Sequence, residues 1–243
     1  MWFDPEVAAT FAHVVLDPPP SATGRTFWAA ALGGTWRAAG PGPDHDASLV
    51  PEDGDAYVHH GREAARVPAL VLEVDDLTAA IRQALDLGAT EDDGLLRSPG
   101  GLALRLKPAE PDRRRAPARR WPDGTSSRLV QVCLDCPAAG AEREARFWAA
   151  VTGWAWRDCD SPEFVCHLVP DEGPLQLLVQ RRASAEPDRV TVHLDLGASD
   201  REAEAARLVA LGAVRGATGD GWVVLHDPDG RTFCATGQPP EAP

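Results

Sequence analysis

Two short apolar segments carry polar side chains at alternating positions, which places those side chains on one face of a β-strand. Gln131, Cys133 and Asp135 share a face of the segment 129–135, and His193 and Asp195 share a face of the segment 190–196. Because buried polar groups need partners, this concentration predicts either an internal hydrogen-bond network or a ligand site. His193 is the candidate catalytic residue, a general base adjusted by Asp135 or Asp195, which are candidate ligand-binding residues. The alternative is a hydrogen-bonded histidine without a chemical role.

The cysteines do not point to a disulfide scaffold, because their number, five, is odd and the chain is large. Cys133 and Cys136 have C-x-x-C spacing, but no second pair completes a zinc site. We interpret them as ordinary thiols of a strand.

A segment of the first half recurs 120 residues later, with seven matches in eleven positions. Such a repeat indicates two homologous domains in tandem. The first strands also align, 13–17 with 131–135. The seven matched residues are Phe27, Trp28, Ala29, Ala30, Gly33, Trp36 and Arg37 in the first half, and Phe147, Trp148, Ala149, Ala150, Gly153, Trp156 and Arg157 in the second.

The tryptophans divide into repeated and unrepeated ones. Those at matched positions, such as Trp28 and Trp148, are predicted to be core residues. Trp154 has Gly34 as its counterpart and Trp222 has no obvious one. Unmatched aromatic residues are the better candidates for stacking on a ligand, with local packing as the alternative.

Each half is predicted to contain a strand, a helix and further strands, and then the same order again. The first helices end at Gly33 and Gly153, which suit a left-handed helix stop. The second helices run over about 76–87 and 200–211, and Ser199 with Glu202 has the spacing of a capping box. The pattern predicts an α+β fold.

Composition limits the partners. The formal charge of -13 and the pI near 4.9 argue against a nucleic-acid partner and favour a cationic ligand, although plain solubility is the simpler reading. No apolar run approaches the roughly 18 residues of a membrane span, and no leader-like N-terminus is present. We therefore expect a cytoplasmic protein with a small-molecule partner and no membrane partner.

We expect the two homologous domains at 1–108 and 127–238, separated by an Arg/Pro-rich linker at 109–126 and followed by a tail at 239–243. The linker lacks apolar periodicity and is predicted to be exposed. Its arginines are expected to pair with the acidic domains. The alternative is a basic arm for an anionic partner.

The chain resembles the vicinal oxygen chelate superfamily, the glyoxalase and bleomycin-resistance proteins, and in particular its glyoxalase-like branch. This resemblance implies two tandem domains, each built from paired βαβββ modules that form a cupped mixed sheet with helices outside. The residues that carry it are Phe147-Trp148-Ala149-Ala150 with Gly153-Trp154, His193-Leu194-Asp195-Leu196, Leu211-Gly212-Ala213, and Asp227-Pro228-Asp229-Gly230 with Cys234.

Proteins of that family can hold a divalent metal at the bottom of each cup, with ligands from three strands. The resemblance places Gln131, His193 and Cys234 at these positions in the second domain. Imidazole and thiolate suit zinc or iron, with manganese or nickel as further choices. The glyoxalase I reaction is not expected, because its enzymes need a carboxylate that neither last strand supplies.

In the first domain the same positions match His13, Ala69 and Arg105. Alanine cannot bind a metal, and a guanidinium repels a cation, so no metal is expected there. Asp17 and Glu73 are predicted to share the cup with Arg105. The group is either a charge-paired network that replaces the metal, or a site where Arg105 recognises an anion.

Two functions follow from the resemblance. The first is a small-molecule-binding protein with a degenerate metal site and no cofactor, which sequesters a drug or metabolite. It would be a monomer with an internal pseudo-dimer, or a homodimer. The second is a metal-dependent lyase, isomerase or dioxygenase that uses the second domain.

Overall fold

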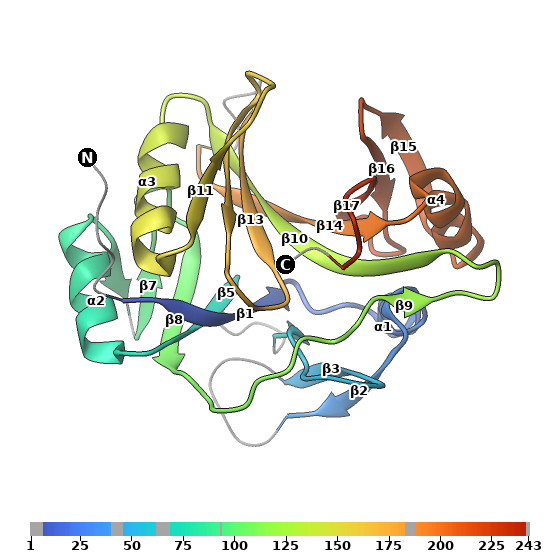
Figure 1. Cartoon of the computed structure of the whole chain (residues 1–243), viewed down its shortest axis with the longest axis horizontal. Coiled ribbons are helices and arrows are strands. Elements are labelled where there is room, and N and C mark those ends of the chain that lie inside the picture. Colours follow the sequence, from blue (N-terminus) through green and yellow to red (C-terminus); the bar gives the residue numbers. More distant parts are fainter. Residues whose placement is uncertain (1–6, 40–45, 62–68, 93, 183–187, 242–243) are drawn as a thin grey trace.

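The computed structural model describes residues 7–39, 46–61, 69–92, 94–182 and 188–241. It contains two open mixed sheets and four helices (Figure 1), which confirms the α+β prediction. The first repeat contains β1 (Ala9–Leu16), α1 (Ala22–Leu32), β2 (Gly34–Ala38), β3 (Ala47–Pro51), β4 (Val58–His60), β5 (Leu70–Val74), α2 (Leu77–Asp86), β6 (Thr90–Asp92), β7 (Leu95–Arg97) and β8 (Ala103–Pro108). The second contains β9 (Arg119–Arg120), β10 (Ser126–Pro137), α3 (Ala141–Thr152), β11 (Ala155–Asp158), β12 (Phe164–Val169), β13 (Gln176–Arg182), β14 (Thr191–Ala198), α4 (Arg201–Ala210), β15 (Val214–Thr218), β16 (Trp222–His226) and β17 (Thr232–Thr236).

The two sheets have the same strand order. The first is β2-β3-β4-β1-β5-β8-β7-β6, and the second is β11-β12-β13-β10-β14-β17-β16-β15, with β9 added at the edge of β10. Each sheet therefore joins two modules through one antiparallel pair, β1 with β5 and β10 with β14. The internal repeat in the sequence is a repeat of this whole topology.

The strand registers agree with the sequence alignment of the first strands. Trp36 and Trp156, which match in the repeat, are linked across neighbouring strands to Val14 in the first sheet and to Val132 in the second. The structural counterpart of Gln131 is therefore His13, as the alignment predicted.

Local signals set the helix ends. Gly33 and Gly153 end α1 and α3 with φ of 68° and 69°, in the left-handed region where glycine carries no Cβ penalty. The predicted capping box at Ser199 is wrong, because Asp200 is the N-cap of α4 and accepts hydrogen bonds from the backbone of Glu202 and Ala203.

The two repeats pack against each other through α1. Trp28 is fully buried, and its indole Nε1 donates to Asp227 Oδ2 in the second repeat at 2.9 Å. Phe27 and Trp28 both contact the Phe233 ring, with centroid separations of 5.7 and 5.2 Å. The core of the second repeat is therefore completed by a helix of the first.

α3 makes the reciprocal contact with different polar groups. Trp148 is also fully buried, but its Nε1 donates to Glu144 on its own helix at 3.0 Å. The other Glu144 oxygen accepts from the backbone of Gly100 in the first repeat at 2.8 Å. The matched tryptophans are core residues, as predicted, and each has a carboxylate partner from a different place in the chain.

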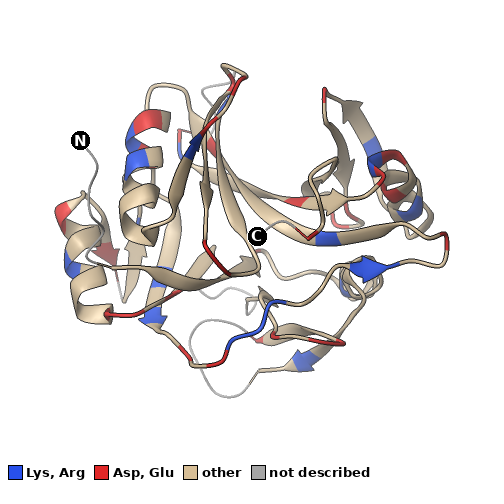
Figure 2. Ribbon diagram, in the orientation of Figure 1, with Lys and Arg blue, Asp and Glu red and all other residues tan. Residues whose placement is uncertain are grey.

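The linker packs on the first repeat. Arg119 pairs with Glu52, and Arg114 pairs with Asp53 at 3.2 Å, so the predicted pairing with acidic residues is confirmed. In Figure 2 this charged segment passes beneath the second sheet and above β2 and β3 of the first. The prediction that the linker is exposed is only partly correct, since Ala116 is buried. Among the described residues, no helix is both long and apolar enough to cross a membrane.

Candidate functional site

The strands β11–β13 and β15–β17 lie on either side of β10 and β14 in the second sheet (Figure 1). We call the face between these two groups of strands the second cup. It contains a cavity of about 190 Å³. It opens between β12–β13 on one side and β16–β17 on the other. The side chains that line it are mostly polar or aromatic: Gln131, Cys133, Phe164, His167, Gln180, His193, Asp195, Asp220, Trp222, Cys234, Thr236 and Gln238, with Leu178.

His193 lies between two carboxylates at the cavity wall. Its Nδ1 is 2.7 Å from Asp135 Oδ2, and its Nε2 is 3.4 Å from Asp195 Oδ1. Burial lowers the pKa of His193, but the charges of Cys133 and Asp195 and the hydrogen bond with Asp135 outweigh it and raise the pKa well above the usual 6.5. The structure therefore favours an imidazolium held by both acids that the sequence singled out.

Asp195 is buried, with one carboxylate oxygen bonded and the other not. Gln131 Nε2 donates to Asp195 Oδ2, while Oδ1 has no hydrogen-bond partner among the described residues. Burial raises the pKa of this carboxyl. The amide of Gln131 is oriented by its own Oε1, which accepts from Gln176 and Gln238 at 2.8 and 2.9 Å. Asp195 Oδ1 is thus an available acceptor at the cavity wall.

The second cup offers a plausible set of metal donors. His193, Asp195 and Cys234 each have a ligand atom within 4.8 Å of the others, and Asp195 lies beside Cys234 in the β14–β17 register. Imidazole, carboxylate and thiolate together suit zinc or iron. Since Asp195 Oδ1 also lacks a hydrogen bond, these residues fit a divalent metal. Gln131, the ligand implied by the resemblance, uses its side chain to hold Asp195 instead.

The thiols would have to lose protons to bind a metal. Burial raises the pKa of Cys133 to about 12, and burial also raises that of Cys234. A metal would therefore compete with protons on both the thiol and His193.

The two candidate stacking residues have different positions. Trp222 lines the cavity, and its ring is 6.0 Å from the Phe164 ring in an edge-on arrangement. Trp154 does not line it: this residue is buried, and its Nε1 donates to the backbone oxygen of Ala9 in the first repeat at 2.8 Å. Position therefore favours stacking for Trp222 and packing between the repeats for Trp154.

The first cup is the corresponding face of the first sheet, around Glu73. This carboxylate is fully buried and accepts from His13 Nε2 at 2.9 Å and from Arg113 Nη2 at 2.7 Å, with Lys107 Nζ at 3.0 Å. Burial raises the pKa of Glu73, but the hydrogen bonds from His13 and Arg113 outweigh it and hold the pKa far below the usual 4.5. This is the charge-paired network that was one of the two predictions.

The guanidinium in this network belongs to Arg113, not to Arg105. Arg113 comes from the linker, where the sequence shows only a run of arginines with no signal for which one enters the sheet. Arg105 lies opposite Val71 in the first sheet, as Cys234 lies opposite Asp195 in the second. Each follows the glycine of the preceding turn by four residues, so Arg105 is the counterpart of Cys234, as the alignment predicted. The described contacts of Asp17 do not include Glu73, although burial raises its pKa and the charge of Arg231 opposes this.

The counterpart positions in the first cup do not suit a metal. His13, Val71 and Arg105 stand where the second sheet has Gln131, Asp195 and Cys234. A valine side chain offers no ligand, and a guanidinium repels a cation. The reason for expecting no metal there therefore stands.

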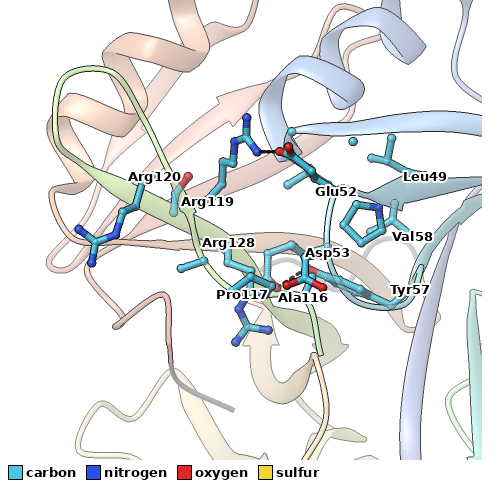
Figure 3. Close-up of a pocket in the computed structure, with 17 residues that line it drawn as sticks. Leu49, Glu52, Asp53, Tyr57, Val58, Ala116, Pro117, Arg119, Arg120 and Arg128 are labelled. Carbon is cyan, nitrogen blue, oxygen red and sulfur yellow. Dashed lines mark hydrogen bonds and ion pairs between the residues drawn. The ribbon is translucent and has the colours of Figure 1, made fainter. Parts of the chain in front are cut away.

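A further cavity of about 350 Å³ lies beneath the linker, away from both cups (Figure 3). Leu49, Val58 and Leu129 form an apolar part of its wall, and Tyr57 donates a hydrogen bond from its hydroxyl to the Leu129 backbone at 3.1 Å. The Glu52–Arg119 ion pair lies at its edge. No pattern in the sequence predicted this cavity, because the cavity depends on how the linker packs.

A model of the glyoxalase-like domain matches residues 13–106 and again residues 131–236. The matched ranges cover most of the chain and coincide with the two repeats. No curated protein sequence matches significantly.

Solved structures with the same fold include ring-cleaving and related oxygenases. A variant of 4-hydroxymandelate synthase from Streptomyces coelicolor has a TM-score of 0.54 and 16% identity over 96% of this chain and 92% of its own. The 2,2',3-trihydroxybiphenyl 1,2-dioxygenase of Sphingomonas wittichii strain RW1 has a TM-score of 0.55 and 15% identity over 94% and 89%. A xylose isomerase-like TIM barrel/4-hydroxyphenylpyruvate dioxygenase fusion protein has a TM-score of 0.55 and 16% identity over 94% of this chain, which spans 49% of the fusion protein. At these identities the likeness concerns the fold.

Proposed function

This chain belongs to the glyoxalase-like domain family, and we propose that its second cup binds a small organic cation, as a protein that sequesters a drug or metabolite. The single observation that carries the proposal is the buried Asp195 Oδ1, which lines a cavity and makes no hydrogen bond among the described residues, with His193 Nε2 at 3.4 Å. A buried carboxylate oxygen without a hydrogen bond is costly, so a ligand that donates one gains the corresponding free energy.

Charge supports a cation as the ligand. The cavity wall and its neighbours carry Asp135, Asp195 and Asp220 against the single imidazolium of His193. The net charge of -13 would add a favourable long-range field. Trp222 and Phe164 supply aromatic surface, on which a cation or an apolar ligand body can pack.

Calorimetry tests this proposal with matched ligands and variants. We expect organic amines and guanidines to bind, and their carboxylate analogues of similar size not to bind. Asp195→Asn removes the charge with little change in shape and is expected to weaken binding at least about tenfold, the equivalent of about 1.4 kcal/mol. No binding by any cation of a broad panel, or equal binding by Asp195→Asn, would rule out this site.

The alternative function, a metal-dependent lyase, isomerase or dioxygenase, is favoured by the donor cluster of His193, Asp195 and Cys234. A divalent metal there would supply Lewis-acid polarisation of ligand oxygens. In that case the chain's own contribution is to hold the donors: Asp135 orients the His193 ring, and Gln131 orients Asp195.

Elemental analysis separates the two functions. Protein purified without chelator is compared with His193→Ala and Cys234→Ser. Near-stoichiometric metal that both variants lose would support the enzyme, whereas metal-free protein that binds organic cations would support sequestration. Gln131→Ala is an informative third variant, because it would reduce metal content only if the orientation of Asp195 matters.

A further inference from the structure

We propose that the first cup is a binding site for a guanidinium group and that the linker residue Arg113 occupies it in cis. A free molecule that carries a guanidinium would then bind the same site whenever Arg113 is absent or displaced. This site is separate from the second cup, so the proposal goes beyond the function proposed above.

The surroundings of Arg113 have the chemistry of such a site. Glu73 Oε1 accepts from Arg113 Nη2 at 2.7 Å and from Nε at 3.0 Å, and Oε2 accepts from the same Nε at 3.3 Å. Two adjacent donors of the planar guanidinium therefore engage this carboxylate. Two further carboxylates lie close: Glu110 Oε2 is 3.0 Å from Nη2, and Asp55 Oδ1 is 3.6 Å from Nη1. The guanidinium carbon is 5.3 Å from the centre of the Phe11 ring, within the range of a cation–π contact.

The acceptor in this site is held in place independently of Arg113. Glu73 Oε2 accepts from the Glu110 backbone at 3.0 Å, and Oε1 accepts from His13. His13 Nδ1 is in turn 2.9 Å from His59 Nε2, and His59 Nδ1 is 2.9 Å from Ser48 Oγ. These hydrogen bonds hold the Glu73 carboxylate in place without using the Arg113 side chain. The position of the acceptor therefore does not depend on the guanidinium that it binds.

Another cavity gives access to the site, and its wall carries more acidic than basic side chains. A space of about 370 Å³ lies against Phe11 and Arg113, and its wall includes three acids, Asp171, Glu172 and Glu241, and one further cation, Arg115. A molecule with a guanidinium at one end and an amine at the other could place the first on Glu73 and the second near these acids. The ligand class is therefore a guanidinium compound with a second cationic group, and agmatine is a suitable probe.

The tether explains why the site is filled in the intact chain. A group on the same chain competes at an effective concentration on the order of millimolar or higher, because only a few residues separate Arg113 from β8. A free ligand must exceed that concentration or bind more tightly. The intact protein is thus expected to bind agmatine at the first cup much more weakly than a variant without the Arg113 side chain.

The experiment uses Arg113→Ala in an Asp195→Asn background, so that the second cup does not contribute. We expect agmatine to bind this protein at least about tenfold more tightly than Asp195→Asn alone, since the intramolecular competitor is gone. It should also raise the melting temperature, because a ligand that binds only the folded state stabilises it. Methylammonium, a cation without the planar donor pair, is expected to bind weakly or not at all.

Two further variants serve as controls. Arg114→Ala removes a neighbouring arginine whose partner, Asp53, is exposed, and it should create no site. Adding Glu73→Gln to Arg113→Ala should abolish agmatine binding. If Arg113→Ala is unfolded alone, agmatine is expected to restore its near-UV circular dichroism. Failure to restore it, or a folded Arg113→Ala that does not bind agmatine, would overturn the proposal.

Discussion

Glu73 and Asp195 are buried carboxylates on corresponding strands of the two sheets, two positions apart in the alignment of the repeats, and they are satisfied to different degrees. Both oxygens of Glu73 accept hydrogen bonds, and two cationic side chains reach it. Asp195 has one oxygen hydrogen-bonded, while the other makes no hydrogen bond among the described residues and lies 3.4 Å from His193 Nε2. A buried carboxylate on this strand therefore stabilises the fold in one repeat and is available to a ligand in the other.

The first prediction concerns acid stability. Because the pKa of Glu73 is held below its usual 4.5, the unfolded chain binds a proton more readily than the folded one. The contribution of Glu73 is therefore complete above about pH 4.5 and declines as the pH falls below it. Glu73→Gln should lower the free energy of unfolding near neutral pH by about 2–4 kcal/mol, because it removes the buried carboxylate that the partly buried Arg113 and Lys107 share.

Urea denaturation from about pH 6 to about pH 3 measures this effect. The wild-type protein should lose stability more steeply than Glu73→Gln in the acidic part of the range. Glu110→Gln, at an exposed partner of the same arginine, is the matched control and should change stability by no more than about 1 kcal/mol. Parallel curves for wild type and Glu73→Gln would show that Glu73 does not contribute in this way.

The second prediction is the opposite behaviour of Asp195. Asp195→Asn keeps an oxygen that can accept from Gln131 and removes a buried charge whose other oxygen makes no hydrogen bond among the described residues. We expect the free energy of unfolding to change by less than about 1 kcal/mol, or to rise, while cation binding is lost. Chemical denaturation measures the first quantity and calorimetry the second. A loss of several kcal/mol would mean that Asp195 is a structural residue.

The third prediction concerns the contact between repeats. Trp28→Phe keeps most of the buried ring but removes the donor to Asp227, and should cost about 1–3 kcal/mol. Trp36→Phe removes a partly buried donor to the Arg25 backbone within one repeat and should cost less. Thermal unfolding of the two variants gives the comparison. Equal losses would remove any special role for the contact between repeats.

The fourth prediction separates the two unrepeated tryptophans. Trp222→Ala should weaken ligand binding by about 1–3 kcal/mol, as loss of an aromatic platform typically does, with a smaller effect on the melting temperature. Trp154→Phe should lower the melting temperature, because its donor to Ala9 is lost, and leave ligand affinity unchanged. Binding isotherms and melting curves for both variants test this assignment. A loss of affinity in Trp154→Phe with unchanged affinity in Trp222→Ala would contradict it.

The repeated features of the fold could be predicted from the sequence, and the contacts of the linker could not. Duplicated tryptophans and helix-ending glycines identified the two modules of each half, because packing and backbone geometry restrict those positions to few residue types. The polar face of β10 and β14 was equally visible as an alternating pattern. His193 and Asp195 were named from it, although Asp195 was not among the predicted metal donors, whereas Cys234 was named from the family resemblance.

The alignment of His13 with Gln131 agrees with the strand registers, because the duplicated tryptophans fix the alignment of the neighbouring strands. One error has a clear physical reason: the guanidinium that pairs with Glu73 was expected from Arg105 and comes from Arg113. Arg113 was one of several similar arginines, and its partner Glu73 lies 40 residues earlier in the chain. Such a long-range pair depends on the path of an irregular segment, on which local sequence gives no information.

The packing of α1 on Phe233 has a consequence for how the molecule can be divided. Each half leaves part of its apolar interior to be covered by the other, so a chain cut between β8 and β9 should yield fragments that aggregate when produced separately. Mixed together, or synthesised in one cell, they should reassemble into a native particle that melts in one step. The duplication thus gave rise to a molecule whose halves are similar in form but no longer self-sufficient.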